Sequence, residues 1–150
     1  MSVSEFVPQV HALKGSTINM LRYLTKICTV TPFKAEKRYQ DLGKKCSLFI
    51  KLLEGVVSHA NYISIGQSIK KLALKHDIPR LIMEKNQDAL LILNPFDIGS
   101  DYKNLCSNMN ITSSDFDTIK SLLNHDRLTE EHKKPIWNCL NVIVESSMDM

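Results

Sequence analysis

The segment from residue 31 to residue 57 constrains the fold most, because it is the longest stretch whose apolar residues keep to one side of a helix. Thr31 is a favourable N-cap residue, and Pro32 suits the first helical position, where its missing N–H costs nothing. At about 100° per residue, the apolar side chains form one stripe. The stripe consists of Ala35, Leu42, Cys46, Phe49, Leu53 and Val56, with Tyr39, Ile50 and Val57 beside it. The pattern predicts a long helix over 31–57 at the centre of the fold.

The remaining surface of this predicted helix is basic. Six basic side chains share it: Lys34, Lys37, Arg38, Lys44, Lys45 and Lys51. Only Glu36, Asp41 and Glu54 interrupt the positive charge. Gly43 lies inside the helix and costs it about 1 kcal/mol relative to alanine, which weakens the pattern there without removing it. The six basic residues are therefore candidate contacts for phosphates or for an acidic partner.

Size and composition favour one helical domain. A chain of 150 residues is long enough for one hydrophobic core and short for two. Hydrophobic residues make up 43% and charged residues 23% of the sequence, as in an ordinary globular protein, so extensive disorder is not expected. Only five glycines and five prolines are present, too few to turn many short strands. We therefore predict an all-α fold, a single domain over 1–150 with about five to seven helices around one core.

Further helices are predicted on both sides of the central one. Their expected ranges are 6–13, 16–28, 65–77, 80–88, 115–124 and 129 onward, with a connection at 58–62. Gly15 is the expected break between the first two helices. The residue before Pro79 resists helical geometry, which predicts a helix end there. Since only a few residues join 16–28 to the central helix, these two helices are expected to pack as an antiparallel hairpin.

The C-terminal half contains three less regular stretches. The apolar run 89–93 is too short to classify by periodicity, so it fits a strand, a buried helix or a contact in an oligomer, and we favour a helix. Polar residues dominate 94–112, which predicts a long surface loop. Pro135 lies about one turn inside the last predicted helix, which indicates either a kink or a later start. The tail 146–150 is expected to be frayed.

Charge and cysteine usage indicate an intracellular protein. The net charge of +3 and the pI of about 8.6 are too mild to predict nucleic-acid binding by themselves. The cysteines lie far apart in the sequence, at Cys28, Cys46, Cys106 and Cys139. Neither a secretory signal nor an apolar stretch of about 18 residues accompanies them. We expect reduced thiols, a location in the cytoplasm or nucleus, and no membrane contact.

The sequence contains none of the usual signatures of catalysis or cofactor binding. We find no phosphate-binding loop, dinucleotide-binding glycine motif, nucleophile elbow or zinc-ligand pairing. His125, His132 and Cys139 follow one another at intervals of seven, but a tetrahedral metal site needs a fourth ligand and an unbroken helix through Asp126 and Pro135. Four aspartates are more typical of helix caps and turns than of catalytic pairs. They are Asp97, Asp101, Asp115 and Asp117. We therefore predict no catalytic residue, cofactor or metal ion.

Two features have both a structural and a functional interpretation. The basic helix face is either a solvated surface or a contact for phosphates or an acidic partner, and the second interpretation implies steeply salt-dependent binding. Lysine dominates this face and no aromatic residue is interleaved for base recognition, so sequence-specific reading of nucleic acid is not expected. Trp137, the sole tryptophan, is either a core anchor or an interface anchor for a partner.

The segment 122–145 contains an acidic turn, paired lysines, an Ile-Trp pair and a leucine three residues later. These features lie at Glu130, Glu131, Lys133, Lys134, Ile136, Trp137 and Leu140. The segment resembles a C-terminal pattern in small uncharacterised proteins of large nucleocytoplasmic DNA viruses. The resemblance covers about a sixth of the chain. It implies a viral protein made in the infected cell, with no established activity or site.

The sequence leads to three hypotheses about function. The first is a non-enzymatic helical interaction protein that contacts other proteins, as a structural component of a viral particle or another large assembly. The second is a nucleic-acid-associated protein that holds phosphates non-specifically through the basic helix face. The third is an enzyme whose residues converge only in three dimensions. We favour the first hypothesis, and the oligomeric state is not predicted.

Overall fold

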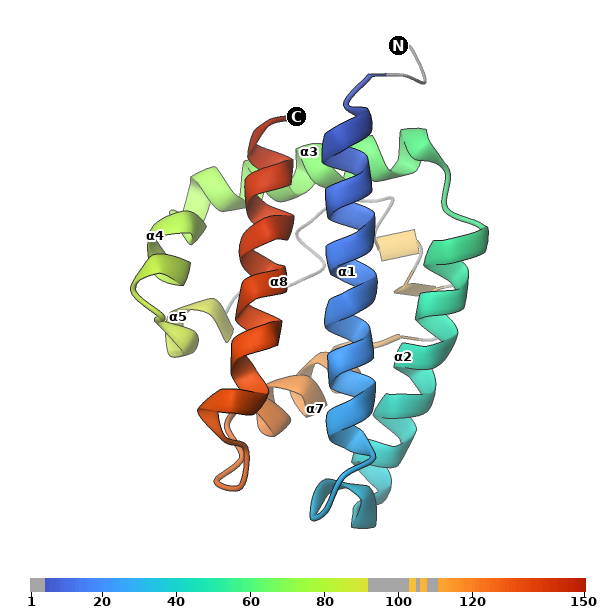
Figure 1. Ribbon diagram of the computed structural model, residues 1–150, viewed down its shortest axis with the longest axis vertical. Helices are drawn as coiled ribbons and strands as arrows, with labels where there is room; N and C mark the ends of the chain where they lie inside the picture. The colour runs from blue at the N-terminus through green and yellow to red at the C-terminus, as the bar shows by residue number, and fades with distance from the viewer. Residues whose placement is uncertain (1–4, 92–102, 105, 108–110) are drawn as a thin grey trace.

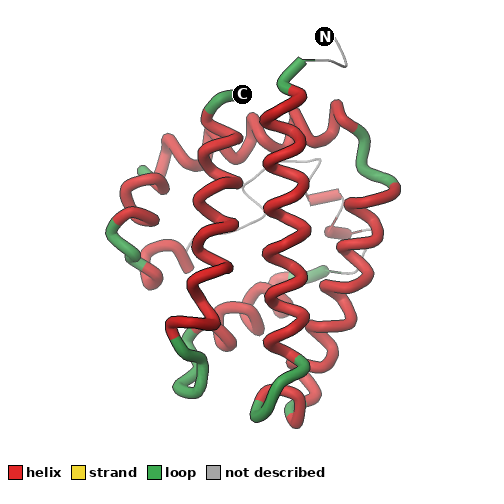
Figure 2. The backbone as a smooth tube through the Cα atoms, viewed as in Figure 1, coloured by secondary structure: helices red, strands yellow, loops and turns green. Residues whose placement is uncertain are grey.

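The computed structural model describes residues 5–91, 103–104, 106–107 and 111–150. In this part of the chain all regular structure is helical, as Figure 2 shows, which confirms the predicted all-α fold. The elements are α1 (Val7–Cys28), the 3-10 turn η1 (Phe33–Ala35), α2 (Lys37–Gly55), α3 (His59–His76), α4 (Ile78–Met83), α5 (Gln87–Leu91), α7 (Ser113–Leu123) and α8 (Glu130–Met148). None of these helices is long and apolar enough to cross a membrane.

Three long helices lie side by side in the bundle. Helix α1 lies between α8 and α2 and runs antiparallel to both of them (Figure 1). Helix α3 crosses near the ends of α1 and α8 and packs against both. The middle position therefore belongs to α1, and not to the 31–57 helix that the sequence predicted there. The predicted antiparallel packing of the helix ending at Cys28 against α2 is confirmed.

Helix α1 continues through Gly15, so the predicted break at this residue is wrong. A glycine inside a helix costs about 1 kcal/mol relative to alanine. On either side of it, Leu13 and Ile18 are buried at 1% and 6% exposure. Burying each such side chain contributes about 1.5–3 kcal/mol, which outweighs the cost of the glycine. The core contacts of α1 thus hold the helix continuous across a residue that favours a break.

Helix α2 begins at Lys37, six residues later than the predicted N-cap Thr31. The backbone at Glu36 is extended, with ψ at 125°, and it separates α2 from the turn η1. The turn directs Phe33 into the core, where its ring meets Tyr39 and His125 edge-on at centroid distances of 5.8 and 4.9 Å. Phe33 is completely buried, and the extended residue Glu36 divides the predicted helix into η1 and α2. The Thr31–Pro32 peptide bond is cis.

The predicted apolar stripe of α2 is buried over the length of the helix itself. Its buried members are Leu42, Cys46, Phe49 and Leu53, together with Tyr39 and Ile50. Ala35 and Val56 lie outside α2 and are exposed. The helical period therefore identified the core face correctly, and the two errors result from the predicted helix being too long at both ends.

The buried residues form two large clusters and one small one. The first joins α1, η1, α2, α7 and α8 around Phe33, Tyr39 and Leu122. The second joins α1, α2, α3 and α8 around Leu13 and Ile63. The small cluster packs α4 against α3 and α8. Helix α1 contributes to both large clusters, which accounts for its middle position in the bundle.

The ends of α3 and α8 illustrate how local chemistry sets helix boundaries. Helix α3 begins at His59, because the hydroxyl oxygen of Ser58 accepts a hydrogen bond from the N–H of Asn61 at 3.1 Å, so the predicted connection at 58–62 is wrong. It ends at His76, before Pro79 as predicted. The predicted start of the last helix at Thr129 is confirmed, and α8 includes Pro135 without interruption.

The C-terminal tail is ordered, and the prediction of a frayed segment 146–150 is wrong. Helix α8 extends to Met148, and Ser147 is completely buried. The hydroxyl of Ser147 donates a hydrogen bond to the carbonyl oxygen of Ile143 at 2.7 Å, so this polar group is satisfied inside the core. The side chain of Met150 packs where Gly66 of α3 has no side chain. The tail is therefore held by contacts that its own sequence does not indicate.

The predictions for the segment after α4 fall partly outside the described residues. Two helices, α4 and α5, replace the single helix predicted over 80–88. The favoured helical interpretation of 89–93 holds for 89–91, which end α5, and the rest of that run lies outside the described residues. Most of the predicted loop 94–112 also lies outside them. Within that range, residues 103–104 and 106–107 are helical and Cys106 is completely buried, which contradicts a surface loop at that point.

The two glycines inside α1 and α2 provide a first prediction. A Cβ atom at Gly15 would meet nothing within 4 Å, so Gly15→Ala should raise the free energy of unfolding by about 0.5–1 kcal/mol. A Cβ atom at Gly43 would lie 3.3 Å from the Cβ of Cys28, a buried residue on α1. Gly43→Ala should therefore lower the free energy of unfolding by about 1 kcal/mol despite its higher helix propensity.

Urea denaturation of the two variants and the wild type measures both effects. Gly15→Ala serves as the matched control, because it changes the same residue type in a helix interior. Equal stabilisation by both substitutions would show that α1 and α2 are not in close contact at Gly43.

Candidate interaction surface on helix α2

Three exposed lysines of α2 form a row along one side of the helix. Lys37, Lys44 and Lys51 are spaced by seven residues, which is about two helical turns, so they share one face. All three are exposed. We call them the lysine row. Lys34 in η1 is also exposed and extends the basic surface beyond the N-terminal end of the row.

These four lysines have no acidic partner within the described part of the chain. No ion pair joins the lysine row or Lys34 to a described carboxylate, even at separations up to 4.0 Å. Asp41 lies beside the row and pairs with none of its lysines. Glu54, near the end of α2, instead lies 3.8 Å from the guanidinium of Arg22 on α1. The positive charge of the row is therefore available to another molecule.

The other two candidate basic residues point to a different edge of α2 and have partners there. Arg38 Nε donates to Glu36 Oε1 at 3.2 Å, and its guanidinium stacks 4.6 Å from the ring centroid of Tyr39. Lys45 Nζ donates to both carboxylate oxygens of Asp115 at 3.0 and 2.8 Å. The structure thus divides the six predicted contacts into four available lysines and two residues held within the fold.

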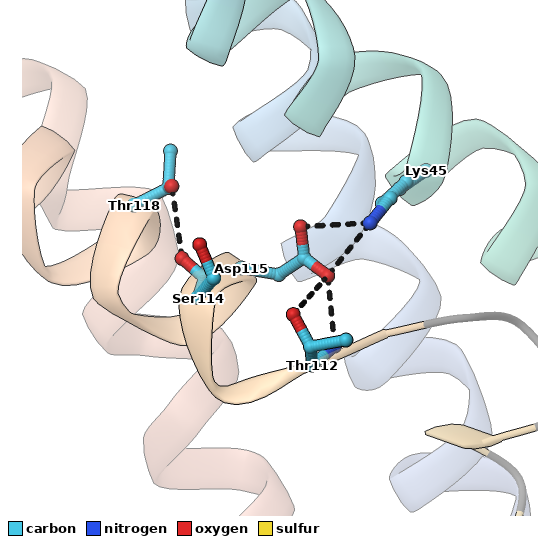
Figure 3. Close-up of polar contacts among 5 residues, drawn as sticks. All are labelled: Lys45, Thr112, Ser114, Asp115 and Thr118. Atoms are coloured by element: carbon cyan, nitrogen blue, oxygen red, sulfur yellow. Dashed lines mark hydrogen bonds and ion pairs between the residues drawn. The ribbon is translucent and has the colours of Figure 1, made fainter.

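The carboxylate of Asp115 joins α2 to the start of α7. Figure 3 shows it between the ammonium of Lys45 and the backbone of Thr112. The Thr112 N–H donates to Asp115 Oδ2 at 2.8 Å, which caps the N-terminus of α7. With the side chains of Lys45 and Asp115 at 34% and 17% exposure, the pair is partly shielded from water. This contact fixes the edge of α2 opposite to α1, and so it orients the lysine row.

An open groove of about 670 Å³ lies between the C-terminal half of α1, η1 and α2. Cys28 and Gly43 lie at its floor, where the two helices approach each other closely. Lys34 and Lys44 line its edge, together with Leu48. We call it the α1–α2 groove. Lys44 is thus the member of the lysine row that borders this concave surface, and Lys34 borders it as well.

The surface of the α1–α2 groove is almost entirely apolar, although several polar residues line it. The hydroxyl of Thr25 donates to the carbonyl oxygen of Leu21 at 2.8 Å, and that of Thr29 donates to the carbonyl oxygen of Lys26 at 2.7 Å. Both hydroxyls are thus satisfied by the backbone of α1. The Leu48 side chain is 54% exposed at the edge of the groove. The groove therefore offers methyl groups and aliphatic stems, with cationic groups along one side.

Two buried thiols lie under this surface and are chemically quiet. Burial raises the pKa of Cys28 from its ordinary value of 9.0 to about 11. The pKa of Cys46 is raised to about 12, mainly by burial and to a smaller extent by the nearby Cys28 and Asp115. A thiol with a raised pKa is a poor nucleophile, because the reactive form is the thiolate. All four cysteines are free thiols, as the sequence predicted, and Cys139 is the most exposed of them.

The structure does not bring the predicted metal candidates together. His125 lies in the loop before α8, so the unbroken helix that would align it with His132 and Cys139 is absent. Its Nδ1 accepts the N–H of Arg127 at 3.0 Å, and its ring packs on Phe33. Among the described residues, no group of three or more His, Cys, Asp or Glu side chains is arranged to hold a metal ion. Asp97 and Asp101 lie outside the described residues.

Trp137 is half-buried on α8. This placement agrees with either of its two interpretations, so its role as an interface anchor stays a prediction. The groove residues are what sequence reasoning missed. Gly43 was the available signal, because a glycine on the buried side of an amphipathic helix often marks a close approach of another backbone.

Comparisons with protein-family models, with curated proteins and with solved structures find no match to this chain.

The contact between Lys45 and Asp115 provides a second prediction. Asp115→Ala removes both the partner of Lys45 and the cap of α7, so it should lower the free energy of unfolding by about 2 kcal/mol. Asp115→Asn keeps an acceptor for Thr112 and should cost about 1 kcal/mol. Asp117→Ala, at an exposed position of the same helix, is the control and should change stability by less than about 0.5 kcal/mol. Chemical denaturation that gives equal values for Asp115→Ala and Asp117→Ala would contradict this role.

The buried thiols provide a third prediction, on the pH dependence of stability. Their pKa values are raised in the folded state, so above pH 9 the unfolded chain loses protons that the folded chain retains. Stability should be unaffected by these thiols below pH 9 and should fall as pH rises toward about 11 to 12. Each thiol should contribute about 1 kcal/mol of loss at one pH unit above its ordinary pKa.

Denaturation of Cys46→Ala on both sides of pH 9 tests this prediction. The variant is expected to be less stable than the wild type at neutral pH, but to lose less stability as the pH rises. Cys139→Ala is the control: burial also raises the pKa of this thiol, but Cys139 is the most exposed of the four, so its removal should change the slope less than removal of Cys46 does. A wild-type slope in Cys46→Ala would show that Cys46 is not protected from ionisation.

Proposed function

We propose that this protein is a non-enzymatic interaction protein that binds an acidic region of a protein partner through the lysine row and Lys34. The observation that carries the proposal is the set of four exposed lysines on one side of η1 and α2 with no ion pair to any described carboxylate. Charge complementarity of this kind speeds association and selects against partners of the same charge.

The scaffold behind the lysine row supports this role. Helix α2 is held on one side by the close contact between Gly43 and Cys28, and on the other by the ion pair between Lys45 and Asp115. Binding groups on a rigid helix lose little freedom when a partner binds. The raised thiol pKa values arise from burial, so they do not indicate a nucleophile. These features favour binding over catalysis as the function.

The setting of this function follows from the C-terminal resemblance. It implies a viral protein in the cytoplasm or nucleus of an infected cell. We therefore propose that the partner belongs to a viral particle or to another large assembly.

The lysine row also supports a second function, the non-specific binding of nucleic acid, since phosphates would occupy the same side chains. The logarithm of the affinity for duplex DNA falls with the logarithm of the salt concentration, with a slope of about 0.9 per neutralised phosphate. Removing two lysines would therefore reduce this slope by about 2. The row contains no arginine, whose planar fork is the common means of recognising phosphates and bases. We therefore rank this function second.

Capture of partners from native cells tests the proposed function. We expect tagged wild-type protein to recover a defined set of proteins that nuclease treatment does not change. The double variant Lys44→Glu, Lys51→Glu should recover these proteins at least about tenfold less well, because attraction becomes repulsion at two positions.

The control is the double variant Lys71→Glu, Lys75→Glu on α3, which changes the formal charge by the same amount at exposed lysines on another helix. It should recover the partners as well as the wild type does. Equal losses in both variants would indicate a general effect of charge and contradict the assignment to α2. Recovery that depends on nuclease would favour the nucleic-acid function.

A further inference from the structure

The α1–α2 groove is open to solvent, whereas sites for small molecules bury about 70–90% of the ligand surface. The α2 residues that line the groove lie between Gln40 and Leu48 and include Lys44. Lys37 and Lys51 continue the lysine row beyond both ends of this stretch, so that the row spans 14 residues, or about 21 Å of helix. A helix of about 15 residues would match this length when it lies beside α2. The geometry therefore fits a helical segment better than a compact ligand.

The chemistry of the groove specifies which kind of helix would bind. Its floor is apolar, because the hydroxyls of Thr25 and Thr29 are turned to backbone carbonyls of α1. The exposed side chain of Leu48 adds apolar surface at the edge. Lys34 and Lys44 provide positive charge along the same edge. A matching helix would carry apolar residues toward the floor and carboxylates toward the lysines.

We propose that the α1–α2 groove docks an amphipathic acidic helix of a partner protein, with its apolar side chains on the floor and its carboxylates on the lysine row. This inference rests on the proposed function and names the partner's chemistry. Helices that bind in grooves commonly use apolar anchors on one face in this way. Carboxylates two turns apart in the ligand would lie about 10 Å apart, which is the spacing of the row.

A nucleic-acid strand fits the same surface less well. Single strands are bound by stacking bases on aromatic rings beside a basic path. The described residues that line the groove include no aromatic side chain. The groove surface is almost entirely apolar, so it replaces little of the water that phosphates or bases would lose. The lysine row alone would attract a strand, but the groove would add nothing to its binding.

A defined set of stapled helical peptides of about 15 residues tests the proposal. Each peptide carries the same charged residue, either Glu or Lys, at three positions that are two helical turns apart. Between these positions it carries the same uncharged residue, either Leu or Ser, at two positions. Fluorescence anisotropy measures the binding of each peptide to the full-length protein. We expect the peptide with Glu and Leu to bind at least about tenfold more tightly than the peptides that lack either feature. A single-stranded oligonucleotide of similar length serves as the competing polyanion.

Two variants locate the binding site. Lys44→Glu combined with Lys51→Glu should remove the preference for Glu over Lys, and Leu48→Ser should reduce the preference for Leu over Ser. Both variants change exposed side chains, so circular dichroism should show a wild-type fold. The controls are Lys71→Glu combined with Lys75→Glu, and Leu74→Ser, which changes another exposed leucine, on α3.

The outcomes separate this inference from the proposed function. Binding that requires Glu but is indifferent to Leu would overturn the groove as a docking site and leave the lysine row as a charged contact. Equal binding of all peptides would also overturn the groove as a docking site. The proposed function is tested separately, by the capture of partners through the lysine row. An oligonucleotide that binds more tightly than every peptide, with the same loss in the α2 variant, would overturn both in favour of nucleic acid.

Discussion

The close contact of α1 and α2 at Gly43 is the constraint on which most of this structure depends. Gly43 has no side chain, and a Cβ atom at this position would lie only 3.3 Å from the Cβ of Cys28. The two helix backbones therefore approach closely along one edge of α2. This approach buries Cys28 and Cys46, and it sets the rotation of α2 about its own axis. The lysine row faces away from the core as a result.

A second contact holds the opposite edge of the same helix. Lys45 reaches Asp115, which at the same time caps the start of α7. At the N-terminal end of α2, the rings of Phe33, Tyr39 and His125 pack together, so the turn η1 and the loop before α8 are joined to it. Helix α2 is therefore fixed by packing on one edge, by charge on the other and by aromatic contacts at its end. The basic residue used in these contacts is Lys45, and it is not one of the four lysines that have no ion pair to a described carboxylate.

The fold class and the core face of α2 could be predicted from the sequence, because both follow from the spacing of apolar residues along a helix. The start of α2 could not, since Phe33 is buried by packing that includes His125 and other residues far away in the chain. The continuation of α1 through Gly15 could not be predicted for the same reason, because the burial of neighbouring side chains outweighs the local preference of glycine for a helix break. For the candidate site, the sequence identified all six basic residues but not the two with internal partners. The partner of Lys45 lies 70 positions away, and periodicity contains no information on such pairs.

The antiparallel order of the three long helices has a consequence for how the chain folds. The pairing of α1 with α2 needs only the short segment around η1, so its loop-closure entropy is small. The pairing of α1 with α8 joins elements about a hundred positions apart, and such contacts form more slowly. During synthesis, both helices of the α1–α2 hairpin leave the ribosome before α8 does. Until α8 emerges, the apolar side of α1 that it covers has no such cover, and exposed apolar surface of this kind promotes aggregation of a nascent chain.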